Sequence, residues 1–371
     1  MKCPYCGKRV RGRPADCPHC HKALPEKKKA SGKRIVFGVL IALAAVLLAL
    51  SVTAVSVIYA FLDHVEHGSE LSSGVISTVN EELDESITNI ALFGLDTRKD
   101  NGGGRSDVIM VLSLDHKHNK IKLTSVARDT YVAVEGRKNF KLAHAWAYGK
   151  SNLAVKALNQ NFDLNITHYA YVNFFEFAEL IDYIGGVDIT LTEGEVKIAN
   201  SMITGEQNYL GIVCEPIPGS GLQHLSGGQA LAFARNRTIG TDAARTSRQR
   251  KVLTAVYEQL KKIPVSQYPA TITRMLDMCH TNLTNGELLE IATWAIAKSP
   301  SMETFSLPTA DCHPKSGKDA YINGTWYYIY DMDVATRQLH TFIYEEDASA
   351  STITTAATSA TESVSATTTA R

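Results

Sequence analysis

Arginine side chains are concentrated in the segment 232–250, "AFARNRTIGTDAARTSRQR", of a 371-residue chain whose formal net charge is zero. Asp242 is the only acid in this segment, and its five arginines are Arg235, Arg237, Arg245, Arg248 and Arg250. A guanidinium group binds phosphate oxygens through two parallel hydrogen bonds, so this density indicates a local site for a phosphate-bearing ligand. Because the chain as a whole has no positive excess, the sequence argues against general binding to nucleic acid.

Charged residues also stand at the ends of three predicted strands. The apolar and β-branched runs that predict these strands are 89–96, 106–115 and 120–129. Asp96 closes the first run, and Arg128 lies near the end of the third. Arg105 and Asp107 stand where the second run begins. Contact with water explains any one such charge, but neighbouring strands would bring all four to one edge of a sheet, which favours a shared site.

Helical and strand patterns alternate along the rest of this region. Helices are predicted at 141–162, 174–185, 226–237, 246–262, 285–298 and 332–345, and further strands at 166–173 and 187–192. Such alternation is typical of layered α/β domains, so we expect an α/β/α domain with a central mixed sheet over residues 88–347.

The N-terminal residues 1–24 contain two CxxC pairs, formed by Cys3, Cys6, Cys17 and Cys20. Four thiolates on two tight turns match the tetrahedral preference of Zn²⁺, and a segment this small has no core without a metal. Two disulfides are the alternative, but a reducing cytoplasm disfavours them. We therefore predict a cytoplasmic zinc ribbon, with His19 and His21 as possible substitute ligands.

An uncharged apolar run at 35–62 predicts a transmembrane helix, because at about 1.5 Å per residue it can cross a core of roughly 30 Å. The basic linker 25–34 precedes it and an acidic stalk, 63–87, follows, which places the N-terminus in the cytoplasm and the later domain outside. A cleaved signal peptide usually has a shorter apolar region, so we expect an uncleaved single-pass anchor. The Ser/Thr-rich residues 348–371 are expected to be a disordered tail.

Three further cysteines lie beyond the predicted span: Cys214, Cys279 and Cys312. Their spacing is too wide for a metal knuckle, and their odd number allows at most one internal disulfide. We expect Cys279 and Cys312 to form it.

The outer region resembles the LytR-CpsA-Psr family over essentially its whole length and in the same order. The resemblance is carried by "ALFGLDTR", "RSDVIMVLSLD", "KIKLTSVARDTYV", "KLAHAWAYG", "YAYVNFFEFAELIDYIGGVDI", "HLSGGQALAFARNR" and "DAARTSRQR". Members are membrane-anchored enzymes of Gram-positive walls that transfer teichoic acids, capsule or similar glycopolymers from a polyprenyl diphosphate carrier to peptidoglycan. Ala127 departs from the family's usual proline, and the zinc ribbon is an addition to the family pattern.

The resemblance also implies roles for individual residues. Diphosphate binding is expected of Arg105, Arg128, Arg235, Arg237, Arg245 and Gln249, and substrate contact also of Arg98, Lys141, Asp242 and Arg248. Arg250 lies outside this match and is expected to be solvated. Mg²⁺ binding is expected of Asp96 and Asp107, which together with Arg105 and Arg128 form the expected catalytic set. The proton of the attacking hydroxyl would pass to Asp96, Asp107 or Asp242.

Several neighbouring residues have two interpretations. Lys141 and His144 belong either to the site or to the structure around it. Phe174, Phe175, Phe177 and Leu180 line a groove for the lipid chain or form ordinary core. Asn173 and Asp182 are expected to be structural or to support the site.

Three functions are compatible with these residues. The first is a Mg²⁺-dependent phosphotransferase that attaches a lipid-linked glycopolymer to peptidoglycan. The second is a polyprenyl diphosphate hydrolase, which uses the same arginines and metal but takes water as the acceptor. The third is a non-catalytic wall-polymer-binding regulator whose zinc ribbon binds a cytoplasmic partner. The Asp96 and Asp107 pair argues against the third, because a binder has no need of a metal.

Overall fold

The computed structural model describes residues 1–12, 14–24, 68–96, 104–204, 211, 213–235, 242–264, 267–312 and 320–345. The chain forms two compact units, Met1–Ala60 and Phe61–Arg371. The predicted span 35–62, the linker 25–34 and the tail 348–371 lie outside the described residues. Within the described residues, every helix is too short or too polar to cross a membrane.

Six strands of the second unit form one mixed sheet in the order β10-β3-β2-β1-β6-β9. They are β1 (Ile87–Leu95), β2 (Ser106–Asp115), β3 (Lys120–Val126), β6 (His168–Asn173), β9 (His280–Thr281) and β10 (Ser301–Leu307). The consecutive strands β1, β2 and β3 are antiparallel, whereas β6 and β10 pair in parallel with β1 and β3. The expectation of a central mixed sheet is confirmed, and β10 is a strand that the sequence did not predict.

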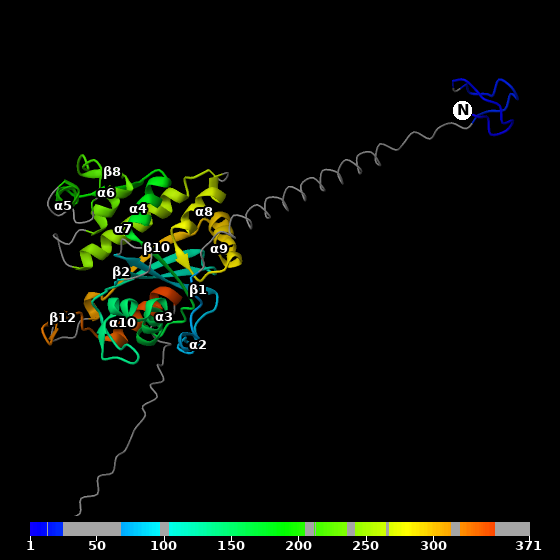
Figure 1. Ribbon diagram of the computed structural model, residues 1–371. Helices are drawn as coiled ribbons and strands as arrows, with labels where there is room; N and C mark the ends of the chain where they lie inside the picture. Colours follow the sequence, from blue (N-terminus) through cyan, green and yellow to red (C-terminus); the bar gives the residue numbers. More distant parts are fainter. Residues whose placement is uncertain are drawn as a thin grey trace, which may run out of the picture. The chain divides into compact units, whose positions relative to one another are not determined.

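Helices cover both faces of this sheet (Figure 1). One face carries α2 (Ser73–Ile76), α3 (Leu142–Phe162) and α10 (Met332–Tyr344). The other carries α4 (Phe174–Tyr183), α5 (Glu193–Thr204), α6 (Gly227–Arg235), α7 (Asp242–Leu260), α8 (Tyr268–Asp277) and α9 (Asn285–Lys298). Three short pairs complete the fold: β4 (Tyr131–Val132) with β5 (Phe140–Lys141), β7 (Val187–Leu191) with β8 (Gly221–Leu225), and β11 (Ala320–Ile322) with β12 (Thr325–Tyr327).

The central strands are apolar on both sides because both faces are covered. In β1, Ala91 and Phe93 pack with α3 and α10, whereas Ile90 and Leu92 pack on the opposite face with α9. This alternation follows the two-residue period of a strand. The core on the α3 side also includes Leu71, Val75 and Leu83, so part of the segment expected to be a stalk belongs to the packed domain.

Asn173 and Asp182 hold α4 in place, as the structural interpretation expected. The side chain of Asn173 accepts hydrogen bonds from the first turn of α4 and forms a capping box with Glu176. Asp182 accepts a 2.7 Å hydrogen bond from the backbone of Gly227 at the start of α6. A side chain at position 227 would overlap the carbonyl group of Ala178, so Gly227 permits the close approach of α6 to α4. This approach sets the position of Arg235 at the end of α6.

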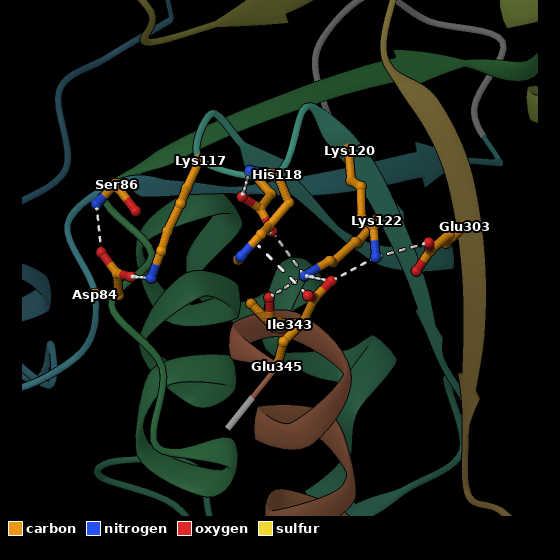
Figure 2. A network of polar contacts seen from close by, with 10 residues as sticks. Asp84, Ser86, Lys117, His118, Lys120, Lys122, Glu303, Ile343 and Glu345 are labelled. Atoms are coloured by element: carbon orange, nitrogen blue, oxygen red, sulfur yellow. Dashed lines mark hydrogen bonds and ion pairs between the residues drawn. The ribbon is translucent and has the colours of Figure 1, made fainter. Parts of the chain in front are cut away.

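A buried ionic network fixes α10 to the sheet at the end of β2 (Figure 2). Lys122 and Asp115 are fully buried, and the ammonium group of Lys122 donates to Asp115 at 2.9 Å and to the carbonyl oxygen of Ile343 at 2.6 Å. Glu345 lies 3.0 Å from the same ammonium, and His118 lies 2.8 Å from Asp115. Because Ile343 and Glu345 belong to the end of α10, these contacts join the C-terminal helix to the β2–β3 hairpin.

Candidate active site

The strand ends predicted to carry chemistry converge on one edge of the sheet. Leu95, at the end of β1, pairs with Ser106 at the start of β2, which places Asp96 and Asp107 on neighbouring strands. β3 runs antiparallel to β2, so Arg128 follows the end of β3 at the same edge. The expectation of convergence is confirmed, and the antiparallel order β3-β2-β1 is its cause.

Each of the two aspartates is bound by an arginine. Two parallel hydrogen bonds of 2.9 Å join the guanidinium group of Arg235 to both carboxylate oxygens of Asp96. Arg128 donates to Asp107 and also lies 3.4 Å from Asp129. Such charge-assisted pairs hold the side chains in defined orientations at a solvent-accessible edge.

A polar cavity of about 580 Å³ opens beside Arg128. Its charged and polar lining residues are Arg105, Arg128, Asp129, Lys141, His144 and Thr325. Lys141 is held by Asp129 at 2.8 Å. Because cations outnumber carboxylates in this lining, the cavity suits an anionic ligand.

Lys141 and His144 both line the polar cavity, and their role in the site stays a prediction. Burial, together with the nearby charges of Arg105 and Lys141, lowers the pKa of His144 below its ordinary value. This shift favours the neutral form of the imidazole. The sequence analysis did not propose Asp129 or Thr325 as site residues. The position of Asp129 directly after Arg128 at a strand end could have indicated the first of these two.

An apolar pocket of about 760 Å³ lies between β1 and β2 and the helices α4, α6 and α7, which cover one face of the sheet. Its walls include Val108, Met110, Phe174, Phe177, Leu231 and Val252. Arg235 and Gln249 supply the charged and amide groups of the lining, and the guanidinium group of Arg235 lies 4.7 Å from the ring of Phe174. The pocket is thus apolar over most of its wall and carries one cation, Arg235, in its lining.

The structure shows which of the four apolar residues 174, 175, 177 and 180 border the pocket and which are core. Phe174 and Phe177 line the apolar pocket, and Phe174, at 8 % exposure, also belongs to the buried core with Leu180 at 7 %. Phe175 is absent from the lining of this pocket. Sequence periodicity shows that all four are apolar but not which of them border an open volume.

The first turns of α7 carry buried polar residues, which are rare without a function or a partner. Arg245, Arg248 and Gln249 are exposed by only 4 %, 3 % and 9 %. Burial lowers the pKa of Arg248, and the charge of Glu195 opposes this shift. Arg98, Arg237 and the side chain of Asp242 lie outside the described residues, so their expected contacts stay predictions.

Arg250 differs from its expectation as a solvated residue. It is half-buried, burial lowers the pKa of its guanidinium group, and one terminal nitrogen is buried without a hydrogen-bond partner among the described residues. The reason is its position on α7, where it faces a groove beside β7 rather than open solvent.

The expected disulfide between Cys279 and Cys312 is wrong, because both thiols are free. Cys279 lines the apolar pocket on one face of the sheet, while Cys312 is buried in the core with α3 and α10 on the other. Burial, with the charge of Glu176 nearby, raises the pKa of Cys279 to about 12.

The N-terminal unit brings its four cysteines together. The Sγ atoms of Cys3 and Cys20 lie 3.7 Å apart, those of Cys6 and Cys17 lie 3.8 Å apart, and all four atoms lie within 4.8 Å of one another. A tetrahedral zinc centre with Zn–S bonds of about 2.3 Å has sulfur–sulfur separations of about 3.8 Å. The cluster can therefore bind zinc through cysteine alone, without His19 or His21.

Two equivalent loops build this cluster. Cys3 donates its backbone N–H to Lys8 at 2.9 Å, and Cys17 donates to Lys22 at 2.9 Å. The isolated bridges Lys2–Arg9 and Asp16–Ala23 close the two loops in the same way. The N-terminal unit is thus a pair of matching knuckles, a repeat that the sequence analysis did not detect.

The LytR_cpsA_psr family model matches residues 55–342. The chain belongs to the LytR-CpsA-Psr family. A relative from Bacillus cereus, the polyisoprenyl-teichoic acid–peptidoglycan teichoic acid transferase TagU, is 30% identical over 269 residues, which cover 71% of this chain and 80% of the relative. TagU from Enterococcus faecalis is 30% identical over 209 residues, covering 55% of this chain and 64% of that protein.

Solved structures of the LytR-CpsA-Psr family share the fold. Bacillus subtilis TagT is 23% identical, with a TM-score of 0.57 over 74% of this chain and 100% of that one. TagT with a bound octaprenyl pyrophosphate lipid is 22% identical, with a TM-score of 0.55 over 75% of this chain and 100% of that one. The likeness confirms a family fold around the mixed sheet.

Proposed function

We propose that this LytR-CpsA-Psr protein is a phosphotransferase that moves an anionic glycopolymer, such as teichoic acid or capsule, from a polyprenyl diphosphate carrier to peptidoglycan. One observation carries the proposal. The apolar pocket is lined by Arg235 and Gln249, and Arg235 in turn binds Asp96 at the catalytic edge of the sheet. A hydrocarbon slot that ends at a guanidinium group suits a lipid with a phosphate head.

The arginines would hold the diphosphate. Arg235 is reached from the apolar pocket, and Arg105 and Arg128 from the polar cavity. Arg245 lies in the first turn of α7, the helix that also carries Gln249. Charge-assisted hydrogen bonds of this type contribute about 1.5–3 kcal/mol each. TagT is named with a bound octaprenyl pyrophosphate lipid, which supports this class of ligand for a family member.

The carboxylates fit Mg²⁺ in their donor chemistry. Asp96 and Asp107 lie at the ends of neighbouring strands, and an ionised carboxylate offers the oxygen ligands that Mg²⁺ prefers. Mg²⁺ takes one or two carboxylates together with phosphate oxygens. Bound there, it would neutralise charge on the diphosphate.

In the proposed reaction, a glycan hydroxyl attacks the phosphorus that carries the glycopolymer. A new P–O bond forms to the acceptor, and the bond to the bridging oxygen breaks, so polyprenyl monophosphate leaves. The hydroxyl proton passes to a carboxylate, either Asp96, Asp107 or Asp242. Arg235 would stabilise the leaving phosphate because it lies where the lipid pocket meets the edge.

The same proposal places the protein in the cell membrane. The apolar run 35–62 would anchor the catalytic domain outside, and the zinc-bound N-terminal unit would lie in the cytoplasm. Protease added to intact, wall-stripped cells should digest the outer domain and leave the first ~60 residues protected. A soluble form cleaved after the apolar run would refute the anchor.

The deciding experiment supplies the full-length protein with a lipid-linked glycopolymer, nascent peptidoglycan and Mg²⁺. We expect polymer attached to the glycan through a phosphodiester and release of polyprenyl monophosphate. Polymer released with a free phosphate group would identify a hydrolase. Unchanged donor at saturating acceptor would contradict catalysis and leave a binding protein.

A further inference from the structure

The described part of the mixed-sheet domain begins beside β9. Gly68 donates its backbone N–H to the carbonyl oxygen of Thr281 at 2.6 Å, and the hydroxyl group of Tyr169 donates to the carbonyl oxygen of Ser69 at 2.9 Å. A side chain at position 68 would overlap the hydroxyl group of Tyr169, so Gly68 permits this close contact. The start of the domain is therefore attached to the strand that lies between α8 and α9 in the chain.

This attachment limits how far β9 can lie from the membrane in the proposed topology. The predicted span ends at Leu62, and Gly68 follows six residues later. At about 3.6 Å per residue, six residues reach at most about 22 Å when fully extended. Because Gly68 is held on Thr281, β9 must lie close to the outer surface of the membrane. Asn285, the first residue of α9, follows Thr281 by only four residues and belongs to the same end of the domain.

The helix α9 is covered incompletely by the rest of the protein, since each of its residues is at least partly exposed. One side of the helix packs Leu288 and Ile291 against the sheet. Another side forms an open groove of about 730 Å³, and Leu289 and Trp294 are among its lining residues, all of which belong to α9. Ile296 is 46 % exposed and follows Leu289 by seven residues, so the two share a face of the helix. The exposed side of α9 is thus partly apolar.

The side chains of this groove match the interface between water and lipid. Tryptophan is enriched there because its ring is apolar and its N–H is polar. Lys298 also lines the groove, and a lysine keeps its ammonium group in water while its methylene groups cover apolar surface. Glu290 and Thr293 complete the polar part of the lining. This mixture is suited to the depth of the phospholipid headgroups rather than to the hydrocarbon.

The apolar pocket reaches the same end of the domain. Cys279 lines it two residues before Thr281, and Ala170 and Tyr171 line it from β6, the strand that pairs with β9. Under the proposed function, a polyprenyl chain leaves the bilayer to enter this pocket. A domain that rests on α9 holds the pocket beside the bilayer, which shortens the path of an apolar chain through water.

We propose that α9 is a membrane-docking surface, with Leu289, Trp294 and Ile296 in contact with the phospholipid headgroups of the outer leaflet. This inference rests on the membrane anchor of the proposed function but not on the transfer reaction. A second copy of this chain is the alternative occupant of an exposed helix face, and the experiment separates the two.

Tryptophan fluorescence tests the contact directly. The chain has three tryptophans and the predicted span contains none of them. Trp146 is 1 % exposed, and Trp326 lies on β12. The full-length protein is reconstituted into vesicles of phosphatidylcholine and phosphatidylglycerol, with and without lipids brominated near the headgroup. Because bromine quenches tryptophan only at contact, we expect quenching in the wild type and in Trp326→Phe but none in Trp294→Phe. Equal quenching in the wild type and Trp294→Phe overturns the inference.

A charge on the exposed side of α9 should weaken the docking. Ile296→Asp brings a carboxylate against the lipid, so it should remove most of the quenching of Trp294. The matched control is Leu222→Asp on β8, where the side chain is 71 % exposed and the same charge should leave the quenching unchanged. Thermal unfolding at the wild-type temperature shows that both variants are folded. Quenching that persists in folded Ile296→Asp contradicts the docking surface.

Extraction with alkaline carbonate separates docking from anchoring. A chain that stays with the vesicles while Trp294 escapes quenching keeps the anchor and overturns the docking. A chain that carbonate releases refutes the anchor and the docking together, while the transfer assay still decides the reaction. Sedimentation in detergent that shows a dimer, lost in Ile296→Asp, assigns α9 to a second copy and also overturns the inference.

Discussion

Arg235 and Asp96 are joined by two parallel hydrogen bonds of 2.9 Å across a sequence separation of 139 residues. This pair links the last residue of α6 to the residue that follows β1, where the apolar pocket meets the edge of the sheet. A carboxylate expected to bind Mg²⁺ therefore already has a cation as its partner. Under the proposed function we expect diphosphate and Mg²⁺ to bind together, since the phosphate oxygens would give the guanidinium group a new acceptor.

Asp107→Asn should separate catalysis from lipid binding. The substitution keeps size and removes one negative charge, so we expect transfer to fall by about two orders of magnitude or more while polyprenyl diphosphate binds within about threefold of wild type. The transfer assay with a parallel lipid-binding titration checks both. Asp277→Asn, on α8, is the matched control. Near-normal transfer, or activity that survives chelation, would show that the aspartates serve only as ion-pair partners.

Arg128→Ala and Arg245→Ala should each weaken binding of polyprenyl diphosphate about tenfold to a hundredfold, because each removes a charge-assisted contact. Arg128→Lys should recover only part of the loss, since it keeps the charge but not the planar fork. Arg250→Ala and the surface control Arg274→Ala should change affinity little. Equal losses at all four arginines would indicate a diffuse basic surface.

Ala234→Trp should fill the apolar pocket, because Ala234 is part of its wall. We expect the affinity for a long polyprenyl diphosphate to fall at least about tenfold, while inorganic pyrophosphate binds as before. Competition binding with ligands of increasing chain length measures this. Ala297→Trp, at an exposed position on α9, is the control. Loss of pyrophosphate binding as well would place the defect at Arg235 and not in the lipid slot.

The full-length chain should contain one zinc ion that depends on the four-cysteine cluster. Elemental analysis should find about one zinc per chain in the wild type and in Cys214→Ser, and almost none in Cys17→Ser. Zinc retained by Cys17→Ser, or all four thiols alkylated rapidly in the loaded protein, would contradict a closed Cys₄ site.

Lys122→Met should destabilise the domain by about 3–5 kcal/mol, because it leaves the buried carboxylate of Asp115 without its ammonium partner. The double variant Asp115→Asn with Lys122→Met should recover much of this loss. Urea unfolding of the wild type, Lys122→Met, Asp115→Asn and the double variant forms a double-mutant cycle. Additive effects would show that the two buried charges do not interact.

The same network predicts an acid-dependent loss of stability. Burial opposes ionisation of Asp115, but Lys122 and His118 outweigh it and lower the pKa from 3.8 to about 2. A folded-state pKa below the unfolded value stabilises the protein fully above the unfolded value, and that stabilisation is lost as the pH falls toward 2. The contribution at neutral pH is roughly 2 kcal/mol. The difference in unfolding free energy between wild type and Asp115→Asn should therefore shrink between pH 5 and pH 2; a constant difference would refute the assignment.

The sequence by itself determined many of the elements and the residue types at their ends, although α5, α8 and β10 were not among the predicted ranges. β2 and α9 cover the residues predicted for them, Ser106–Asp115 and Asn285–Lys298, because apolar periodicity reports which side of an element is buried. The strand-end charges Asp96, Asp107 and Arg128 were identified for the same reason, since polar residues at the ends of apolar runs remain at the edge of a sheet. The two CxxC pairs formed by the four N-terminal cysteines indicated a zinc site by their spacing alone.

Only the tertiary structure decided which elements meet. Periodicity could not separate Phe174 and Phe177, which border an open pocket, from Leu180, which is ordinary core. It could not show that Cys279 and Cys312 lie on opposite faces of the sheet. Nor could it bring Trp326 beside Lys141. Each of these facts depends on contacts between residues far apart in the chain, and such contacts are fixed by the packing of whole helices and strands rather than by any local pattern.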